Sequence, residues 1–491
     1  MLLYIHKNGG RYMSCDKQYI TGANPYMPLW EHVPDGEPRV FEYNGEKRMY
    51  IYGSHEPDNE ECCGRDYVVW SAPVNDLTNW MYHGVSYRGT DGKLMYAPDV
   101  VQKGDTFYLY AAEDCGKRIM LAKSKNPAGP FENPELTELG FDPGVLVDDD
   151  GRVYAYWGGF MEGSHCAELN DDMRTIKQET LCLTPITGYK DIWAEYDDSF
   201  ADCDGFFEAS SMRKIFGKYV YVYSKLHKKP LPDSGVGKDC YGYLSYMYSD
   251  HPLTGFVKGG DISLNAGEII TLPDGTKKST YPWGNNHGGL AEVNGQWYIF
   301  YHRHTGTQIG GRQAMVEPVD IAMDEQGRVF IGDITYVDGQ PVSSKPVEMT
   351  SQGAMINGID AFKIISAGYA CHISGSEGAY IESLTEPSEN LSTKIRNISS
   401  GTIVGFRYLQ FGTCPPKTLS IAADALADIK IRVHLDWHDG KIVAEANIPK
   451  GETQTEVALQ SGIIGKHAVY FEFIGAQEDT IAAFDKFTFN C

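Results

Sequence analysis

A polar residue that could do chemistry stands at the start of each of five apolar stretches. Hydrolysis of a glycosidic bond needs at least two carboxyl groups in different environments, one that donates a proton to the leaving oxygen and one that stays ionised. Carboxyl groups at equivalent points of successive repeats can supply both. The five residues are Asp35 in VPDGEPRVF, Asp99 in YAPDVVQK, Asp142 in FDPGVLVDDD, Glu208 in GFFEASSM and His287 in NNHGGLAEV.

The surroundings of these carboxyl groups differ. Glu208 follows Phe206 and Phe207, and because aromatic surface favours a neutral carboxyl group, we expect a raised pKa and a proton donor. Asp35 lies in a polar stretch flanked by glycine and proline and could stay ionised as a base. Asp99, if close to Glu208, would keep that donor protonated by like-charge repulsion. A single carboxylate at such a point is more often a turn or strand cap, but recurrence in successive repeats argues against that role.

Five short stretches of alternating β-branched and aromatic residues follow these polar residues. A period-2 alternation after a turn is typical of a hairpin strand. Each polar residue lies 9 to 15 positions ahead of a tyrosine, and successive tyrosines are 46 to 77 residues apart, which is enough for a four-stranded sheet. The sequence therefore predicts an all-β fold with a five-bladed β-propeller over residues 14–345, whose inner strands bring the polar residues together. The stretches are EKRMYIYGS (46–54), GDTFYLYAA (104–112), GRVYAYWGG (151–159), GKYVYVYSK (217–225) and NGQWYIFYH (294–302).

A second domain follows the predicted propeller. Residues 338–352, DGQPVSSKPVEMTSQ, are polar and contain two prolines, as a linker does. Short alternating runs separated by turn signals continue to the last residue, without helical periodicity. They predict a β-sandwich, and we place this domain at residues 346–491.

Composition excludes some classes of function. The 491 residues carry a formal net charge of −23, which argues against a nucleic-acid partner because phosphate binding needs clustered lysine and arginine. No apolar run approaches the ~18 residues of a membrane span. The eleven cysteines show no metal-type spacing, and adjacent Cys62 and Cys63 lack the spacing of a redox motif. With no apolar core of a signal peptide in the opening residues, we expect reduced thiols and a cytoplasmic protein. Composition does not indicate the oligomeric state.

The motifs NPYMPLW…PDGEPRVF, YAPDV, FDPGVLVDDDG, FFEAS and NNHGG, in this order, resemble those of the family-43 glycoside hydrolases. The resemblance covers about residues 20–345 and implies a five-bladed propeller and an inverting enzyme for arabinose- and xylose-containing plant polysaccharides. It implies that Asp35 is the general base, that Glu208 is the general acid and that Asp99 tunes and orients this acid. It also implies that His287 binds a central calcium ion through water or supports the site. The C-terminal part resembles, more loosely, a carbohydrate-binding-module-like β-sandwich.

Residues that could bind the sugar follow from the same motifs. Trp30, Tyr96, Phe207 and Trp283 could supply flat apolar platforms, and Arg312 resembles an arginine that reaches a substrate hydroxyl. Packing between blades is an equal alternative for the two tryptophans, as the core is for Phe207. Arg312 would otherwise need a carboxylate partner. The chain reads EAS after the phenylalanines where many relatives read EGP, and it has Tyr96 where many have tryptophan or histidine, so these departures concern the sugar pocket.

The expected function is an exo-acting inverting α-L-arabinofuranosidase or β-D-xylosidase, whose partners are short oligosaccharides derived from xylan or arabinan. The sequence does not distinguish arabinose from xylose. The alternative is a carbohydrate-binding propeller without catalysis, which would require one carboxylate to be missing or misdirected. A retaining fructan-type propeller is disfavoured because its NDPNG and RDP signatures are absent, Arg65 and Asp66 being followed by Tyr67.

Overall fold

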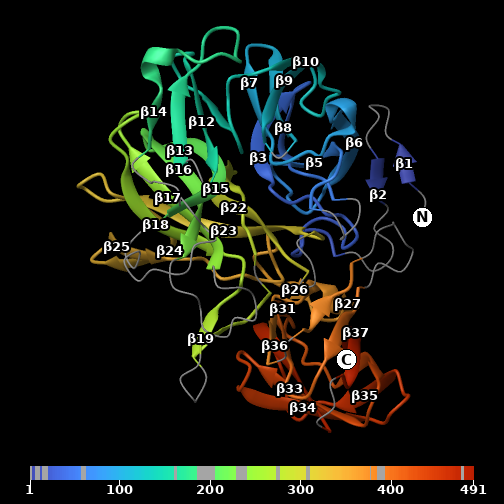
Figure 1. The fold of residues 1–491 in the computed structure, drawn as a ribbon. Coiled ribbons are helices and arrows are strands. Elements are labelled where there is room, and N and C mark those ends of the chain that lie inside the picture. The colour runs from blue at the N-terminus through green and yellow to red at the C-terminus, as the bar shows by residue number, and fades with distance from the viewer. Residues whose placement is uncertain are drawn as a thin grey trace, which may run out of the picture.

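The protein is built almost entirely of β-strands, in a ring of five sheets and a separate sandwich (Figure 1). The computed structural model describes residues 3–5, 11–13, 20–56, 62–114, 116–159, 163–184, 205–227, 240–271, 277–282, 284–305, 310–375, 378–383, 393–476 and 480–491. Within these residues the helical elements are single 3₁₀ turns, η1 (Thr90–Gly92), η2 (Gln178–Thr180) and η4 (Ala367–Tyr369). None of the described helices has the length and apolar character needed to cross a membrane.

Five consecutive antiparallel sheets form the propeller predicted from the alternating stretches. In each blade the strands pair in chain order, so that every sheet is a meander that starts at its innermost strand. The first blade also carries β1 (Leu3–Ile5) and β2 (Arg11–Met13) beyond its outer strand. The blades are β3 (Glu37–Tyr43), β4 (Glu46–Tyr52), β5 (Asp66–Pro73) and β6 (Met81–Arg88); β7 (Asp99–Lys103), β8 (Thr106–Glu113), β9 (Arg118–Ser124) and β10 (Glu132–Leu136); β11 (Gly144–Val147), β12 (Val153–Gly159), β13 (Gly163–Glu168) and β14 (Cys182–Leu183); β15 (Gly205–Ile215), β16 (Lys218–His227), β17 (Cys240–Ser249) and β18 (Val257–Leu264); and β21 (Gly289–Val293), β22 (Gln296–Arg303), β23 (Gln313–Met323), β24 (Val329–Val337) and β25 (Gln340–Lys345).

The repeated tyrosine marks the second strand of every blade. A tight turn precedes that strand, as at Asn44–Gly45 and Asn294–Gly295, where both residues have positive φ, as a two-residue hairpin turn requires. The tyrosines lie in cores between neighbouring blades, where alternate residues of adjacent sheets pack together. The five are Tyr50, Tyr108, Tyr154, Tyr221 and Tyr298 in β4, β8, β12, β16 and β22.

The ring closes where the fifth blade meets the first. Trp70 of β5 lies in one apolar cluster with Phe300 of β22. The amide of Asn24 donates to the Val316 carbonyl at 2.8 Å and to Glu317 Oε1 at 2.8 Å. Hydrogen bonds and apolar contacts therefore hold the start of the propeller against its end, and no described strand is shared between the two blades.

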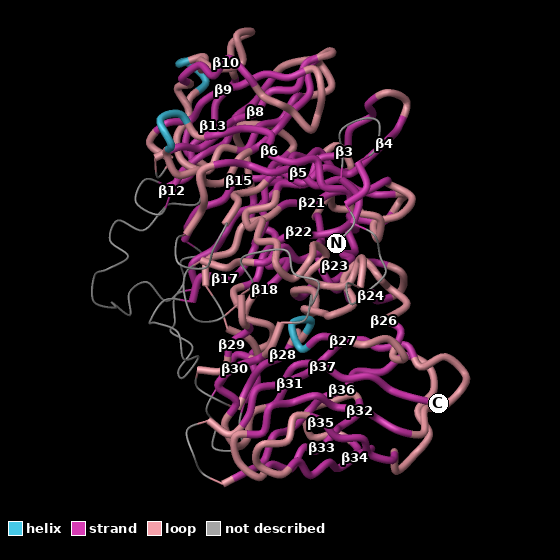
Figure 2. The backbone as a smooth tube through the Cα atoms, turned by 90° about the vertical axis from the view of Figure 1, so that its right-hand side faces the viewer, coloured by secondary structure: helices cyan, strands magenta, loops and turns pink. Residues whose placement is uncertain are grey.

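The sandwich packs against the fourth and fifth blades (Figures 1 and 2). Ile373 donates its backbone N–H to the Thr280 carbonyl at 2.6 Å, next to the hairpin of β19 (Ile269–Thr271) and β20 (Lys277–Ser279). Buried Arg303 donates to the carbonyls of Gly368 and Ala370. The two sheets of the sandwich are β26 (Ile359–Asp360), β31 (Ile403–Gln410), β36 (Lys466–Gly475), β33 (Ile429–Leu435) and β34 (Lys441–Ile448), with β28 (His372–Ser374) on β31; and β29 (Tyr380–Ile381), β30 (Ile395–Ile398), β37 (Ala482–Asn490), β32 (Thr418–Ala425) and β35 (Gln454–Ala458), with β27 (Ile365–Ser366) on β37.

A buried carboxyl group stabilises the point of ring closure. Glu317 accepts hydrogen bonds from Asn24, from the backbone and hydroxyl of Thr350 and from Tyr301. Burial raises the pKa of Glu317 to about 8, although the bonds from Thr350 oppose the shift. Because the unfolded chain loses this proton near the ordinary pKa of about 4.3, the folded state holds one more proton between that pH and about 8. Glu317 therefore lowers the free energy of unfolding as pH rises through this window.

We expect Glu317→Gln to remove this pH dependence, because the amide has nearly the same shape and does not ionise. Relative to wild type, the free energy of unfolding of the variant should rise by about 2–4 kcal/mol between pH 5 and pH 9. Thermal unfolding of both proteins across this range measures the difference, and the other titrating groups cancel because they are common to both. A difference that stays constant with pH would contradict the raised pKa.

Candidate active site

Four of the five polar residues meet in the centre of the propeller. Asp35, Asp142 and His287 each stand two residues before the inner strand of a blade, β3, β11 and β21. Glu208 lies within β15. His287 Nδ1 is 3.6 Å from Asp142 Oδ2, and the charges of Asp35, Asp142 and His287 all act on the pKa of Glu208. The convergence predicted from the sequence is therefore present for these four residues.

Asp35, the predicted base, is held rigidly and stays ionised. Ser54 donates to its Oδ2 at 2.6 Å, and Arg312 Nη1 lies 3.0 Å from its Oδ1. Burial alone would raise the pKa of Asp35, but the Arg312 guanidinium, the nearby His302 and His287 and the hydrogen bond from Ser54 together outweigh burial and lower the pKa well below the usual range of an aspartate. Its φ of 58° lies in the left-handed region, a conformation that costs energy and occurs often at functional sites.

Arg312 binds two carboxylates, Asp35 and Glu56. The sequence analysis gave a carboxylate partner as the alternative to a contact with the sugar. Arg312 is 1% exposed and binds Glu56 through Nε at 2.9 Å and through its backbone N–H at 2.8 Å, besides Asp35. The structure therefore gives Arg312 a role beside the predicted substrate contact, which stays a prediction. Arg312 acts on Asp35, by orienting its carboxylate and keeping it ionised.

Glu208, the predicted acid, is placed by an irregularity in its strand. The pairing of β15 with β16 shifts register on both sides of Glu208, and a bulge of this kind re-aims a side chain. Ala209 follows with a φ of 68°, a conformation that favours glycine. Ala209 is the alanine of EAS, and it thus occupies a position where the glycine of the EGP pattern would fit without strain. The Ala209 N–H donates to Asp142 Oδ2 at 3.2 Å.

The environment of Glu208 suits a proton donor. The side chain is buried, and burial raises its pKa well above the ordinary value, with further increases from the charges of Asp142 and Asp35. Asn285 Nδ2 donates to Oε1 at 3.3 Å. Because an ionised Glu208 would be a third negative charge beside two carboxylates, the protonated form is favoured at neutral pH.

The role predicted for Asp99 is wrong. Both oxygens of Asp99 bind Arg39 Nη2, at 2.8 and 2.6 Å, and the Val145 N–H donates to Oδ2 at 2.7 Å. Arg39 also pairs with Glu37 at 3.2 Å, and Arg213 pairs with Glu37 at 2.7 Å, so that two acids and two arginines form a neutral network.

The reason for this error is strand register. Asp99 is the first residue of β7, whereas Asp35 and Asp142 stand two residues ahead of β3 and β11. A strand rises about 3.3 Å per residue, so a two-residue offset places Asp99 about 7 Å further along its blade. The carboxylate that raises the pKa of Glu208 is instead that of Asp142, a member of the converging set to which the sequence analysis gave no role.

His302 connects the surroundings of the base and the acid, and sequence reasoning assigned it no part in catalysis. Its Nδ1 accepts the Asp35 N–H at 3.2 Å, while its Nε2 lies 2.8 Å from the Asn285 carbonyl, to which it donates. This pattern requires the neutral imidazole, and burial lowers the pKa of His302 well below its ordinary value. The 3.4 Å approach of Nδ1 to Asp35 Oδ1 is therefore no ion pair. A backbone N–H, a ring and an amide thus link Asp35 to Glu208.

The donor set around His287 does not fit a calcium ion held by protein ligands. Calcium takes six to eight oxygen ligands, whereas His287 offers nitrogen and faces Asp142, whose Oδ2 also accepts from Ala209. Burial would lower the pKa of His287, but Asp142, Asp35 and Glu208 raise it to about 9. His287 thus serves as the positive partner of Asp142, and a calcium ion here would have to be bound through water, as the resemblance implies.

The predicted platform residues have different surroundings. Trp30 is half-buried and packs against the cluster between the first and fifth blades. Phe207 is 7% exposed. The Tyr96 ring lies 6.4 Å from the ring of Phe141, a half-buried aromatic residue directly before Asp142 that the sequence analysis did not select. Trp283 lies outside the described residues.

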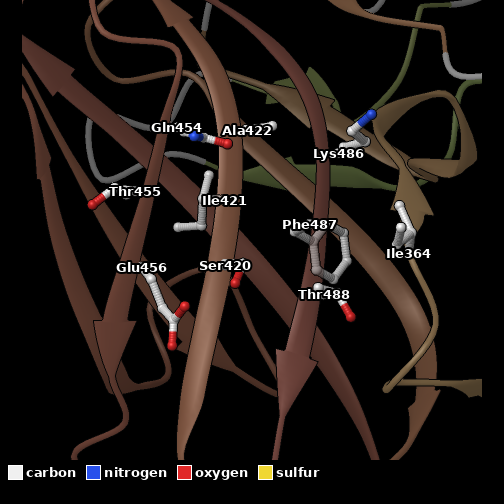
Figure 3. A pocket seen from close by; sticks show the side chains of 10 residues that line it. All are labelled: Ile364, Ser420, Ile421, Ala422, Gln454, Thr455, Glu456, Lys486, Phe487 and Thr488. Atoms are coloured by element: carbon white, nitrogen blue, oxygen red, sulfur yellow. The ribbon is translucent and has the colours of Figure 1, made fainter.

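A hollow on the sandwich lies away from these residues (Figure 3). It occupies about 460 Å³ over β32, β35 and β37. Its single aromatic ring, Phe487, is a core residue with 2% exposure, so the hollow offers no exposed flat platform for a sugar. The lining residues are Ile364, Ser420, Ile421, Ala422, Gln454, Thr455, Glu456, Lys486, Phe487 and Thr488.

Comparisons with known proteins agree with this architecture. Residues 36–195 match the model of glycosyl hydrolases family 43, and residues 369–491 match that of carbohydrate binding module family 6. A xylosidase/arabinosidase of Thermoclostridium stercorarium is 32% identical, over 94% of this chain and 98% of that protein. An arabinoxylan arabinofuranohydrolase of Bacillus subtilis (strain 168) is 25% identical, over 96% and 93%. The likeness to both relatives therefore extends over propeller and sandwich.

Solved structures of similar proteins are also found. A glycoside hydrolase family 43 arabinoxylan arabinofuranohydrolase from Bacillus subtilis, in complex with cellotetraose, covers 96% of this chain and 98% of its own, with 22% identity and a TM-score of 0.47. A family 43 β-xylosidase/α-arabinofuranosidase from a compost metagenome, in complex with xylotriose and in a calcium-free form, covers 64% and 97%, with 25% identity and a TM-score of 0.46.

We expect Asp142→Asn, and not Asp99→Asn, to move the alkaline limb of the pH–rate profile. If Glu208 is the general acid, activity falls as pH rises through the pKa of Glu208. Removal of the negative charge of Asp142 should then lower that pKa and shift the limb of kcat/KM by about one unit or more toward acid. Rate profiles on a xylo- or arabino-oligosaccharide, whose leaving group needs the proton, measure the shift.

The position of the limb does not depend on the amount of folded enzyme, so a loss of stability in either variant does not obscure the result. A limb that moves in Asp99→Asn and stays in place in Asp142→Asn would restore the role predicted from the sequence.

Proposed function

The chain belongs to glycosyl hydrolase family 43 and carries a family 6 carbohydrate-binding module, and from this premise we propose that it is an inverting, exo-acting enzyme that releases arabinose or xylose from xylan- or arabinan-derived oligosaccharides. The observation that carries the proposal is the buried pair of a protonated Glu208 and an ionised Asp35, set apart by opposite shifts of pKa. Similar proteins described as xylosidase/arabinosidase and arabinoxylan arabinofuranohydrolase support the choice of sugars.

In the proposed reaction, Glu208 donates its proton to the glycosidic oxygen as the bond to the sugar breaks. Asp35 accepts a proton from a water molecule that attacks the opposite face of the sugar, which inverts the anomeric carbon. Arg312 and Ser54 hold the Asp35 carboxylate in place for that water. Asp142 keeps Glu208 protonated before the reaction, and His287 balances the charge of Asp142.

A central calcium ion bound through water at His287, which the sequence resemblance implied, stays a prediction and takes no direct part in the proposed proton transfers. The raised pKa of His287 and its contact with Asp142 give the ring a role as a cation, and no step of the reaction needs another one. We also propose a cytoplasmic location, supported by seven cysteines that are free thiols in the structure.

We propose that the sandwich contributes to the site through the fold of the fifth blade. Ile381 donates to the carbonyl of Thr305, and the Thr305 hydroxyl in turn donates to the Gly311 carbonyl at 2.9 Å, directly before Arg312. The sandwich thereby supports the segment that carries the partner of Asp35.

The leaving group separates the roles of Glu208 and Asp35. Nitrophenolate leaves without much help from an acid, whereas the hydroxyl of a sugar needs a proton. We expect Glu208→Gln to lower kcat on xylo- or arabino-oligosaccharides by about 10²–10⁴-fold and to affect nitrophenyl glycosides much less. Asp35→Asn should lower the rate on both substrates, because the water needs its base with either leaving group.

Proton NMR of the first product anomer reads the stereochemistry in the same reactions, and Glu292→Gln, which changes an exposed carboxylate of β21, serves as the matched control. A retained anomer would refute inversion. Binding of oligosaccharides without turnover by wild type would favour the carbohydrate-binding propeller instead.

A further inference from the structure

Two adjacent thiols contact Arg312, the partner of Asp35. The sulfurs of Cys62 and Cys63 are 3.8 Å apart, and Arg312 Nη2 is 3.5 Å from the first and 3.4 Å from the second. Cys62 is partly exposed and Cys63 is buried. The same guanidinium that binds Asp35 Oδ1 through Nη1 thus binds both sulfurs through Nη2.

A second connection joins the thiols to the site through the backbone. The Cys63 N–H donates to Glu56 Oε1 at 3.1 Å, and this oxygen also accepts from Arg312 Nε at 2.9 Å. Cys63 has a φ of 69°, so the peptide between the two cysteines already adopts a turn. A rearrangement of the backbone here would move the Cys63 N–H that binds Glu56. Movement of Glu56 would in turn displace Arg312, which orients Asp35.

The electrostatic surroundings distinguish Cys62 from the other neighbouring thiols of the described residues, Cys63 included, because the hydrogen bond with Cys62 and burial raise the pKa of Cys63 well above its ordinary value. A hydrogen bond from Cys63 lowers the pKa of Cys62, and the charge of Arg312 lowers it further. The sulfur of Cys166 lies 3.3 Å from that of Cys182. By contrast with Cys62, burial raises the pKa of Cys166 well above its ordinary value, so Cys166 stays protonated at neutral pH. A partly exposed thiol beside a cation is the kind that reacts as a thiolate.

A metal-binding site is a less well supported interpretation of the same cluster. Glu56, Cys62 and Cys63 offer ligand atoms within 4.8 Å of one another. However, both oxygens of Glu56 already accept from Arg312, whose charge would repel a bound cation.

We propose that Cys62 and Cys63 form a thiol–disulfide exchange site that reacts with small-molecule disulfides, and that closure of the Cys62–Cys63 bond slows hydrolysis through Arg312 and Asp35. The effect on hydrolysis rests on the proposed role of Asp35. The exchange itself does not.

The reaction balances without any further reagent. The Cys62 thiolate attacks one sulfur of the small disulfide, forming a mixed disulfide and releasing one thiolate, which takes up the proton of Cys62. The Cys63 thiol then loses its proton and attacks the Cys62 sulfur, which releases the second small thiol and closes the bond. Two cysteines are oxidised and one disulfide is reduced to two thiols. Adjacent Cα atoms are about 3.8 Å apart, less than the usual distance across a disulfide, so the bond should be readily reduced again.

The experiment uses the full chain with Cys414→Ser and Cys491→Ser, because these two exposed cysteines lie in contact and would form a competing surface pair. This protein and the same protein with Cys62→Ser are treated with glutathione disulfide. Peptide mass mapping locates the disulfide, and the initial rate on a nitrophenyl glycoside is compared with that of the same protein before treatment and after dithiothreitol.

We expect a Cys62–Cys63 bond with the loss of two hydrogen atoms, a fall in rate of about 10- to 100-fold, and recovery with dithiothreitol. The Cys62→Ser protein should keep its untreated rate. Absence of the bond in the peptide map overturns the exchange site, even if the enzyme has no measurable activity. A bond that leaves the rate unchanged, or an equal loss of rate in Cys62→Ser, overturns the coupling to Asp35 and leaves the proposed function intact.

Discussion

The charge balance of a buried site is the constraint on which the rest of the structure depends. Asp35, Asp142 and Glu208 share the centre of the propeller with two cations, Arg312 and His287, and buried Glu56 also binds Arg312. If all of these carboxyl groups were ionised, negative charges would outnumber the cations in a region of low dielectric, which is costly. One carboxyl group must therefore keep its proton. Glu208 does so because Arg312 is bound to Asp35 and His287 lies beside Asp142, while Asn285 offers Glu208 only a neutral amide.

The fold places its strain at this site. Asp35, Asp142 and Ala209 all have positive φ, at 58°, 49° and 68°, although none of them is glycine. The first two stand at the entrances of inner strands, and the third follows the bulge that aims Glu208. Such conformations persist only where the surrounding structure fixes them, which here is the packing between blades. Ala209, in the EAS departure, thus adopts a backbone conformation that glycine adopts without strain.

A second, neutral network of side chains lies on the inner strands of the propeller. Glu37, Asp99, Arg39 and Arg213 compensate one another there, so they need no proton and add no net charge to the carboxylates of the site. This network explains how an aspartate at the start of an inner strand can resemble a catalytic residue in the sequence and yet serve the fold. The sandwich adds a further restraint, because its contacts at Thr305 and Arg303 fix the strand that carries His302.

The sequence by itself determined the strands, the turns and the identity of the two principal carboxyl groups, because these depend on local patterns. Period-2 alternation located the second strand of every blade, and the aromatic flank singled out Glu208. Tertiary structure alone decided which residues act on them. Alternation determines on which face of a strand a side chain lies, but not how far along the strand it lies. Asp99 is offset by two residues from Asp35 and Asp142, so it binds Arg39, and Asp142 acts on Glu208 instead. The partner of Asp35 lies 277 residues away, and the neutral state of His302 follows from two backbone groups that only the closed ring brings together. No local pattern carries such contacts, since they form only when the fifth blade meets the first.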